Sequence, residues 1–414
     1  MSVNGESREP RRVAITGIGI VSPLGRTAAE HWERLTAGER AARRLPELTE
    51  AQTRSPAADG MTEDWRHWCG APACGEETLP ASGVLERMAL AAAKDAISEG
   101  VGASLETVRP WRLGCVIGVS KPDLCASGDG LADNLLRLHE PSIAVAGRYG
   151  IQGPVLTPSA ACATGLVSLI RGVELIRDGT CDVVVAGSTD WSLSAAYLAA
   201  YRRLGVLARG NGDPAGACLP FDRRRSGFVV GSGAALAVLE DWDRAVNRGA
   251  RILAEWLGSA LAGDASSLVD IEQDGETLAR VIRDALRRSG RLAREIDIAS
   301  LHGTGTRVND LAETRALRKA LGEAADRISY FSLKGSIGHL MGAAGSVETA
   351  TLVLAMNHQT VPPTQNLQVP DPECDLDYTA GAARRRPIRC GLKVSLGFGG
   401  ACAAAILGLP PAGQ

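Results

Sequence analysis

The sequence predicts a layered α/β protein made of two similar halves. Apolar strand patterns alternate with apolar helix patterns along most of the chain, with short joins between them, as in layered α/β architectures. A strand that runs into a small-residue cluster and then an apolar helix occurs at 159–165 and again at 342–346. The 414 residues are enough for one large two-lobed unit. We expect halves at 1–250 and 251–414, joined by the charged connector 240–251.

The first half begins with the apolar run 12–21, which predicts a buried strand entering a Gly-rich turn. Gly17 and Gly19 have the spacing of a dinucleotide-binding turn. We reject that fold because Ser22 and Pro23 follow where a third glycine and a phosphate-facing helix N-terminus are required. The other expected elements of this half are a loop-rich stretch at 37–80, helices at 83–99 and 163–178, an amphipathic segment near 128–139, and strands at 113–119, 183–187 and 234–239.

The second half repeats this plan. Two of its strands lead into turns that contain glycine and histidine, and its last two strands close the chain. The expected elements are a strand at 252–262, helices at 274–290, 310–321 and 343–356, and strands at 392–395 and 403–407.

The composition narrows the classes of function. A formal charge of −2 and a pI of about 6.4 give no reason to expect nucleic acid or an anionic membrane as partner. No apolar run reaches the roughly 18 residues of a membrane span, so we expect a cytoplasmic protein. The ten cysteines lack regular spacing, which favours reduced thiols. Cys69 and Cys74 have no second Cys or His pair at zinc-site spacing, so we expect no metal.

Lysine is scarce in this chain. Ammonium and guanidinium differ in geometry and hydration, so a lysine retained in an arginine-rich chain is informative. Of the 45 basic residues, the lysines are Lys94, Lys121, Lys319, Lys334 and Lys393.

Cys162 is the candidate nucleophile. It lies at the start of an expected helix between Ala161 and Ala163. Free backbone N–H groups and the positive helix end favour a thiolate at such a position, and small neighbours let a substrate approach. A buried, inert cysteine in a small-residue helix is the alternative.

His302 and His339 are the candidate imidazole groups. Each follows an apolar segment within a Gly-rich turn, in the segments 302–306 and 334–339. Glycine permits a tight backbone there. Each histidine alone has a structural alternative, but together with Cys162 they fit a nucleophile with two imidazole donors. The other histidines, at 31, 67, 139 and 358, are interpreted as surface or packing residues.

Two further features accompany this set. The segment 395–400 is a third Gly-rich turn, which lets backbone N–H groups point into a cavity as an oxyanion hole requires; a plain hairpin turn is the alternative. Asp310 and Glu313, on the helix after His302, could neutralise Lys334 if the two segments meet, whereas exposed helix charge is the alternative.

Three segments, in this order and spacing, resemble the elongating β-ketoacyl-acyl carrier protein synthases of fatty-acid and polyketide assembly. They are 161–165 (ACATG), 302–306 (HGTGT) and 334–339 (KGSIGH). The likeness extends over nearly the whole chain, from 12–17 to 397–400. It implies a thiolase-like fold, in which two similar halves form a layered αβαβα core.

The resemblance also implies roles for the motif residues. Cys162 would take an acyl chain from acyl carrier protein as a thioester. His302 and His339 would assist decarboxylation of malonyl-acyl carrier protein and stabilise the enolate, which attacks the thioester to give a 3-ketoacyl product. Lys334 and Glu313 match the supporting pair that orients the histidines.

The same resemblance implies a substrate-binding set. Thr304 and Thr306 match positions that meet the phosphopantetheine arm, and Phe398 matches a gate of the acyl pocket. The backbone N–H groups of the nucleophile and Phe398 would hold the oxyanion, with Gly399 and Gly400 completing that turn. No cofactor is implied beyond the phosphopantetheine of the carrier protein. The partners implied are acyl carrier protein and a second subunit, in a homodimer or in a heterodimer with a related synthase-like chain.

This chain departs from the family pattern at several positions. Ala401 and Cys402 follow Gly400 where Asn is frequent, and Val394 stands where Asn commonly precedes Ser395. The stretch 118–153 is shorter than in typical fatty-acid enzymes, in a region that shapes the acyl pocket and dimer interface. Substrate choice is therefore the least transferable property, and a specialised pathway is plausible.

Three other functions compete with condensation. A non-catalytic chain-length-factor-like subunit shares the fold but usually lacks the nucleophilic cysteine. A degradative thiolase uses a different residue set around a second cysteine. A Cys-dependent acyl hydrolase would pass its acyl group to water and not to malonyl-carrier protein. The Cys-His-His set favours the condensing enzyme.

Overall fold

The computed structural model of the chain contains a large mixed β-sheet. It describes residues 10–45, 68–75, 83–123, 137–209, 212–267 and 271–411. The strands of the first half are β1 (Val13–Val21), β4 (Leu113–Gly118), β5 (Val155–Leu156), β6 (Val183–Trp191) and β7 (Ser232–Asp241). Those of the second half are β8 (Ala254–Gly263), β9 (Ile298–Ser300), β10 (Ser329–Phe331), β13 (Cys390–Gly397) and β14 (Ala401–Gly408). Two small ladders pair β2 (Arg43–Arg44) with β3 (Cys69–Gly70) and β11 (Thr360–Val361) with β12 (Arg384–Arg385).

The two halves of the sheet have the same topology. The strand order is β5-β4-β6-β7-β1 in the first half and β10-β9-β13-β14-β8 in the second. In each half the first three strands of this order are parallel and the last two pairings are antiparallel. The halves join where β1 pairs with β8 over three residues, Val13–Ile15. Matching order and direction in both halves agree with the repeated pattern of the sequence.

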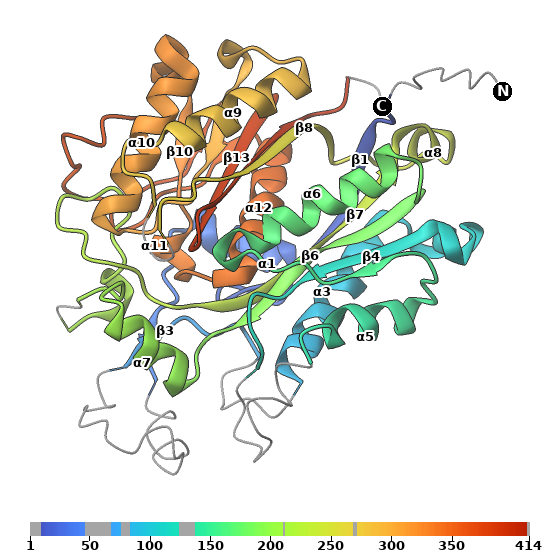
Figure 1. Cartoon of the computed structure of the whole chain (residues 1–414), viewed down its shortest axis with the longest axis horizontal. Helices are drawn as coiled ribbons and strands as arrows, with labels where there is room; N and C mark the ends of the chain where they lie inside the picture. Colours follow the sequence, from blue (N-terminus) through green and yellow to red (C-terminus); the bar gives the residue numbers. More distant parts are fainter. Residues whose placement is uncertain are drawn as a thin grey trace.

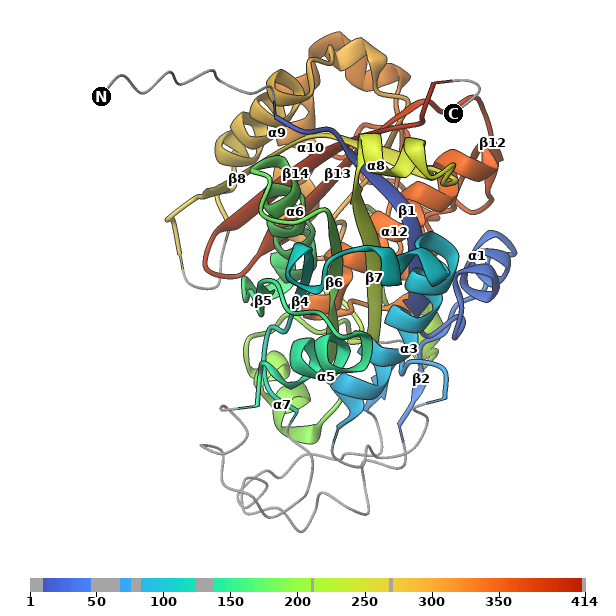
Figure 2. The same ribbon diagram turned by 90° about the vertical axis from the view of Figure 1, so that its right-hand side faces the viewer.

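Helices form three layers around these strands (Figures 1 and 2). α3 and α5 cover one outer face and α9 and α10 the other, while α6 and α12 lie between the two halves. The arrangement is the expected αβαβα core. The helices are α1 (Ala28–Thr36), α3 (Val84–Gly100), α5 (Glu140–Tyr149), α6 (Thr164–Arg177), α7 (Ala195–Arg203), α8 (Trp242–Asn247), α9 (Glu276–Ser289), α10 (Arg307–Leu321), α11 (Lys334–Ile337) and α12 (Ala344–His358).

The apolar core follows the same three layers. One cluster packs α3 and α5 against the first half, a second packs α9 and α10 against the second half, and a third surrounds α6 and α12. α12 is buried on nearly every side because it contacts strands of both halves, so its residues from Ala344 to Met356 are apolar or small except for Glu348. The site described below lies at the N-terminal ends of these two central helices.

The glycines of β1 serve helix packing. A Cβ on Gly17 would lie 2.1 Å from the carbonyl oxygen of Ala96, and one on Gly19 would lie 2.0 Å from that of Ala92. Both contacts are with the backbone of α3, which therefore approaches β1 closely. The rejection of a dinucleotide-binding turn is consistent with this placement, because both glycines lie inside the strand.

We expect Gly17→Ala to lower the free energy of unfolding by about 1–3 kcal/mol, because the added methyl group must push α3 away from β1. Gly147→Ala is the matched control: Gly147 lies in α5 with nothing within 4 Å of a built Cβ, and the change should stabilise by about 0.5–1 kcal/mol. Urea unfolding measures both values. Equal stability of Gly17→Ala and the wild type would contradict this account of β1.

Most expected elements are present within one to three residues of their predicted bounds. The helix α5 was missed, because its pattern is interrupted by Pro141 and Gly147. The predicted amphipathic segment near 128–139, and most of the loop-rich stretch 37–80, lie outside the described residues. His31 is a buried packing residue, bonded to Ser22 and Thr351, and burial lowers its pKa to about 4.

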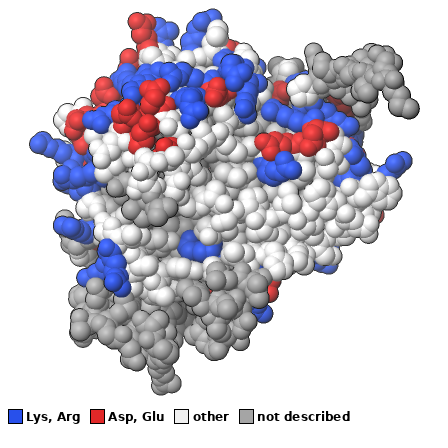
Figure 3. Space-filling model, in the orientation of Figure 1, with Lys and Arg blue, Asp and Glu red and all other residues white. Residues whose placement is uncertain are grey.

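Surface charges of opposite sign lie close together over α9 and α10 (Figure 3). Arg283 and Lys319 both pair with Glu276 there, and Arg287 pairs with Asp284. Across the described ranges, no helix is long and apolar enough to cross a membrane. The same ranges contain no group of three or more His, Cys, Asp or Glu side chains placed to hold a metal ion.

Candidate active site

Cys162 lies in a short 3-10 turn, η5 (Ala161–Ala163), that leads directly into α6. Ala161 has a φ of 47°, a left-handed value that is uncommon for a residue with a Cβ. The equivalent turn of the second half, η9 (Met341–Ala343), leads into α12, and Met341 also has a φ of 47°. Cys162 therefore occupies the position that Gly342 takes in the other half.

The small residues beside Cys162 let the two central helices touch. A Cβ on Gly165 would lie 2.4 Å from the backbone nitrogen of Ser346, and one on Gly345 would lie 2.6 Å from that of Leu166. The hydroxyl groups of Ser188 and Ser346 are 2.6 Å apart at the same contact. The small-residue clusters of the sequence thus bring the two helix starts together, in addition to leaving Cys162 uncrowded.

Burial decides the protonation state of Cys162. It raises the pKa of the thiol to about 11, against the lowering effects of Lys121, Lys334 and the backbone N–H of Phe398. Positive groups around the helix start favour a thiolate, but in the free enzyme the loss of water outweighs them. The thiol holds its proton at neutral pH and must pass it on when it reacts.

The two histidines face each other beside this thiol. His302 follows β9 and His339 follows α11, and their ring centroids are 5.3 Å apart at an interplanar angle of 84°. Burial, followed by the charge of Lys334, lowers the pKa of both rings well below the ordinary value. Both imidazoles are therefore neutral at pH 7, as the sequence-based hypothesis requires.

The hydrogen-bond pattern identifies the tautomer of His339. Its Nδ1 accepts a hydrogen bond of 3.2 Å from the backbone N–H of Met341. A neutral ring that accepts at Nδ1 carries its hydrogen on Nε2. The Nε2–H group is then available as a donor. Phe228 packs edge-on against the ring, with centroids 4.9 Å apart, which fixes its plane.

The main chain of His302 is held from two sides. The Glu313 carboxylate accepts hydrogen bonds from the N–H groups of His302 and Gly303, at 2.6 and 2.7 Å. The ammonium of Lys334 donates to the carbonyl oxygen of His302. Burial raises the pKa of Glu313 to about 7 against these backbone donors. Both residues thus position His302, although they act on different atoms.

The prediction that Glu313 or Asp310 neutralises Lys334 is wrong, because another carboxylate takes that place. Lys334 pairs with Glu348 of α12 at 2.5 Å. Asp310 accepts from the backbone N–H groups of Phe221 and Gly305 and is fully buried, so it is not an exposed helix charge either. Glu348 was missed because a single Glu in an apolar helix pattern gives no local signal of the residue it meets.

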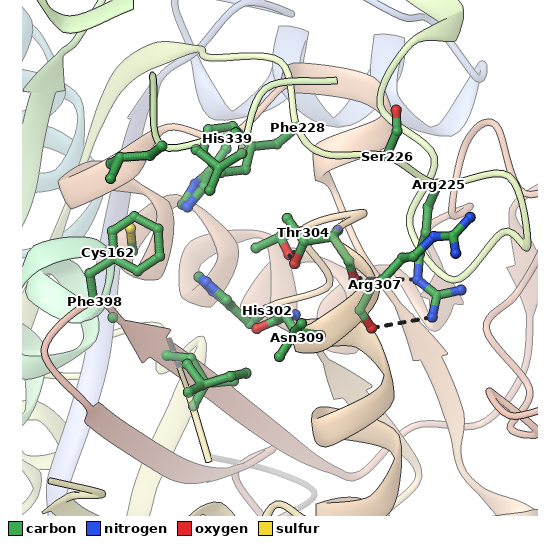
Figure 4. Close-up of a pocket in the computed structure, with 18 of the residues that line it drawn as sticks. Cys162, Arg225, Ser226, Phe228, His302, Thr304, Arg307, Asn309, His339 and Phe398 are labelled. Carbon is green, nitrogen blue, oxygen red and sulfur yellow. Dashed lines mark hydrogen bonds between the residues drawn. The ribbon is translucent and has the colours of Figure 1, made fainter. Parts of the chain in front are cut away.

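A cavity of about 500 Å³ connects these groups (Figure 4). Cys162 and Phe398 lie at one end, and Arg225 and Arg307 at the other. Thr304 and Thr306 lie along the wall between the ends, with their hydroxyl oxygens 2.9 Å apart. The residues that line it include Cys162, Phe228, His302, Thr304, Thr306, His339 and Phe398, together with Arg209, Arg224, Arg225 and Arg307.

The Gly-rich turn 397–400 joins β13 to β14. The N–H of Gly400 donates to the carbonyl of Gly397 at 3.1 Å, and Gly399 and Gly400 have φ values of 82° and 83°, so the turn requires glycine at both positions. This turn brings the backbone N–H of Phe398 within hydrogen-bonding reach of the Cys162 thiol. Gly399 and Gly400 are not among the residues that line the cavity, so their part in the site is to shape this turn.

Lys121, partly exposed, and Asp190, buried, form an ion pair near Cys162 that motif reasoning did not single out. Lys121 lies 3.0 Å from Asp190, which also accepts from the N–H of Gly342 at 3.1 Å. Lys121 is the positive charge that most lowers the pKa of Cys162. The scarcity of lysine was the available signal: Lys121, Lys334 and Lys393 are three of five, and all three lie around this site.

The fold and this cavity define a thiolase-like protein with a Cys-His-His site, and comparisons with known proteins agree. The β-ketoacyl synthase N-terminal domain model matches residues 10–245 and the C-terminal domain model matches 253–368. A putative polyketide β-ketoacyl synthase 1 of Streptomyces halstedii is 37% identical, over 96% of this chain and 98% of that protein. The 3-oxoacyl-[acyl-carrier-protein] synthase 2 of Coxiella burnetii is 31% identical, over 95% and 97%.

Solved structures give the same result. A chain of the AntDE:AntF structure, a type II PKS acyl-carrier protein in complex with its ketosynthase, has a TM-score of 0.86 and 29% identity, covering 97% of this chain and all of that one. The chain belongs to the β-ketoacyl synthase family, and it is an acyltransferase of the condensing type.

Proposed function

We propose that this protein catalyses decarboxylative Claisen condensation of a Cys162-bound acyl chain with malonyl-acyl carrier protein, in a fatty-acid or specialised polyketide pathway. One observation carries the proposal: a thiol, two neutral imidazole rings 5.3 Å apart and a backbone N–H donor meet in one cavity of about 500 Å³. The product is 3-ketoacyl-acyl carrier protein. The relatives named above support the reaction class and leave the acyl chain open.

The first step is transfer of the acyl group to Cys162. The sulfur attacks the incoming thioester carbonyl, a C–S bond forms to Cys162, and the carrier thiol leaves with the proton that Cys162 loses. The backbone N–H groups of Cys162 and Phe398 would hold the oxyanion of this step. Lys121 and Lys334 favour the transient thiolate, since both charges lower the pKa of Cys162.

The second step breaks the bond between the malonyl carboxylate and its α-carbon. CO₂ leaves, and the electron pair passes into an enolate on the thioester. His302 and His339 would donate hydrogen bonds to the enolate oxygen, which neutral rings do without a permanent cation in the site. The enolate carbon then attacks the Cys162 thioester, and the sulfur leaves and recovers a proton.

The cavity also fits a phosphopantetheine arm. Thr304 and Thr306 would hydrogen bond its amide groups along the wall. Arg307, exposed at the end far from Cys162, would meet its phosphate or the acidic carrier protein. Phe398 would gate the acyl group near the thiol. No cofactor beyond this arm is part of the proposal.

The assembly and organisation follow the same resemblance. We propose that the two halves, 1–250 and 251–414, each supply one side of the site: the first carries Cys162 and the second both histidines.

We also propose a dimer, either of two copies or with a synthase-like partner. A ketosynthase/chain length factor structure with a TM-score of 0.82 and 28% identity supports the second form. The described cysteines are free thiols, as a cytoplasmic protein requires.

An assay with carrier-bound substrates tests the proposal. The protein is incubated with acyl-acyl carrier proteins of different chain length and with malonyl-acyl carrier protein, and intact-protein mass spectrometry follows enzyme and carrier. We expect an acyl adduct on Cys162 and then a 3-ketoacyl carrier protein. An adduct that is lost to water would indicate a hydrolase. Product that forms only when a second synthase is added, with no adduct on Cys162, would indicate a chain-length-factor-like subunit.

A further inference from the structure

Lys393 is a lysine inside a buried strand. Its neighbours in β13, Leu392, Val394 and Leu396, pack against the layer of α9 and α10. The Lys393 side chain points to the opposite side, toward α12, and is fully buried. A buried ammonium is costly unless it is paired and hydrogen bonded. Apolar packing alone therefore does not explain why a lysine occupies this buried position.

The contacts of Lys393 tie together the segments that carry the site. Its ammonium lies 2.9 Å from one carboxylate oxygen of Glu348, and Lys334 lies 2.5 Å from the other. Lys393 also reaches the carbonyl oxygen of Ser300 at 3.4 Å, two residues before His302, and donates to the carbonyl of Val394. One side chain thus links β13, which leads to the Phe398 turn, with β9 and α12.

Glu348 is consequently shared by two ammonium groups. Lys334 uses one of its hydrogens on Glu348 and another on the carbonyl oxygen of His302. The second oxygen of Glu348 is buried and accepts no hydrogen bond within the described residues, so its ion pair with Lys393 at 2.9 Å is what compensates its burial. Without that charge the carboxylate could rotate away from Lys334. Lys393 in this way fixes the contact that holds His302.

Four ionisable side chains form a buried cluster. The ammonium groups of Lys334 and Lys393 lie with the carboxyl groups of Glu348 and Glu313, and the pKa of Glu313 is raised to about 7 by burial. The other charged or titratable groups near the rings are Cys162, the Lys121–Asp190 pair and Asp310, which pairs with Arg225. Burial lowers the pKa of Lys393 itself, and the Glu348 carboxylate opposes that shift. In its charged form Lys393 adds to the repulsion that opposes a charge on His302.

We propose that Lys393 is a positioning residue for the condensation: it holds Glu348 against Lys334, and through Lys334 it fixes the main chain of His302. The charge of Lys393 acts in the same direction as burial and Lys334, which keep the His302 ring neutral. The proposal rests on the function proposed above. An imidazolium at His302 would pair with the malonyl carboxylate and stabilise the ground state, which opposes loss of CO₂. The second lysine therefore widens the pH range in which His302 remains neutral.

Removal of the charge tests this role. Burial and Lys334 still act on His302 in Lys393→Met, so its pKa should rise and remain below the ordinary value. Isotope-labelled histidine NMR measures this pKa directly, since the chain has six histidines, and His302→Ala assigns the resonance. The acid limb of malonyl decarboxylation should move to higher pH by the same amount. Lys393→Gln is a second neutral variant and should behave alike if Lys393→Met does not fold.

The double variant Lys393→Met/Glu348→Gln separates charge from mere packing. It removes one positive and one negative charge, so the cluster has the same net charge as in the wild type and the His302 pKa should return toward the wild-type value. A His302 pKa that is unchanged in both neutral single variants, or a shift that the double variant does not reverse, overturns the proposal. The NMR readout needs no turnover, so it stands or falls separately from the condensation reaction.

Discussion

Cys162→Ala is expected to abolish acyl transfer from acyl carrier protein, with a loss of about 10⁴-fold or more, because no other described thiol lines the catalytic cavity with the two histidines. Cysteines at 218, 374, 390 and 402 are buried in the core, with pKa values raised by burial. Mass spectrometry of the enzyme after incubation with an acyl-carrier protein measures the adduct.

Cys69→Ala is the matched control for this substitution. Cys69 is more exposed than Cys162 and lies outside the catalytic cavity, so its removal should leave the adduct unchanged. An acyl group found on Cys69, or retained by Cys162→Ala, would refute the assignment of the nucleophile.

Cys162→Gln should still decarboxylate malonyl-carrier protein, because His302 and His339 remain in place and the amide fills the volume of the thioester.

His339→Ala is expected to lower malonyl decarboxylation by about 10²–10³-fold, the usual cost of removing one hydrogen-bond donor from a developing oxyanion. The reason is the tautomer: Nδ1 of His339 accepts from Met341, so its Nε2–H is the group directed at the enolate. Release of CO₂ from malonyl-carrier protein is measured in the Cys162→Gln background, which removes acylation from the assay.

The rate of acylation distinguishes the enolate role of His339 from a general loss of folded structure. His339→Ala should form the Cys162 adduct at a rate much closer to the wild type than its decarboxylation rate, since the oxyanion of acylation is assigned to backbone N–H groups. His139→Ala, an exposed position at the start of α5, is the control and should match the wild type in both assays. Equal losses in acylation and decarboxylation would contradict the enolate role of His339.

The fold could be predicted well where its signals are local. The clusters at 159–165 and 342–346 predicted a repeated unit, and the structure shows the same strand order in both halves. The repeat could be recognised because the contact between α6 and α12 requires glycine and alanine, and these small residues are consecutive in the sequence. α5 was missed because proline and glycine weaken its pattern.

The site could be predicted in part for the same reason. Cys162, His302 and His339 each lie in a short motif with its own small or Gly-rich neighbours, and the structure brings all three to one cavity. The carboxylate on Lys334 was assigned wrongly because Glu313 is nearer to the motif histidine in sequence. Which acid meets a buried lysine depends on where α12 crosses β13, and no local pattern records that crossing.

The amino-acid sequence alone thus determines the family, the repeated plan of the two halves and the motifs around Cys162, His302 and His339, because each of these motifs is a run of contiguous residues. The folded arrangement adds the protonation of Cys162, the contacts of Lys121 with Asp190, and the sharing of Glu348 between Lys334 and Lys393. These properties depend on burial and on charges brought together from distant segments. Both are set by packing between layers, so they become visible in the folded protein.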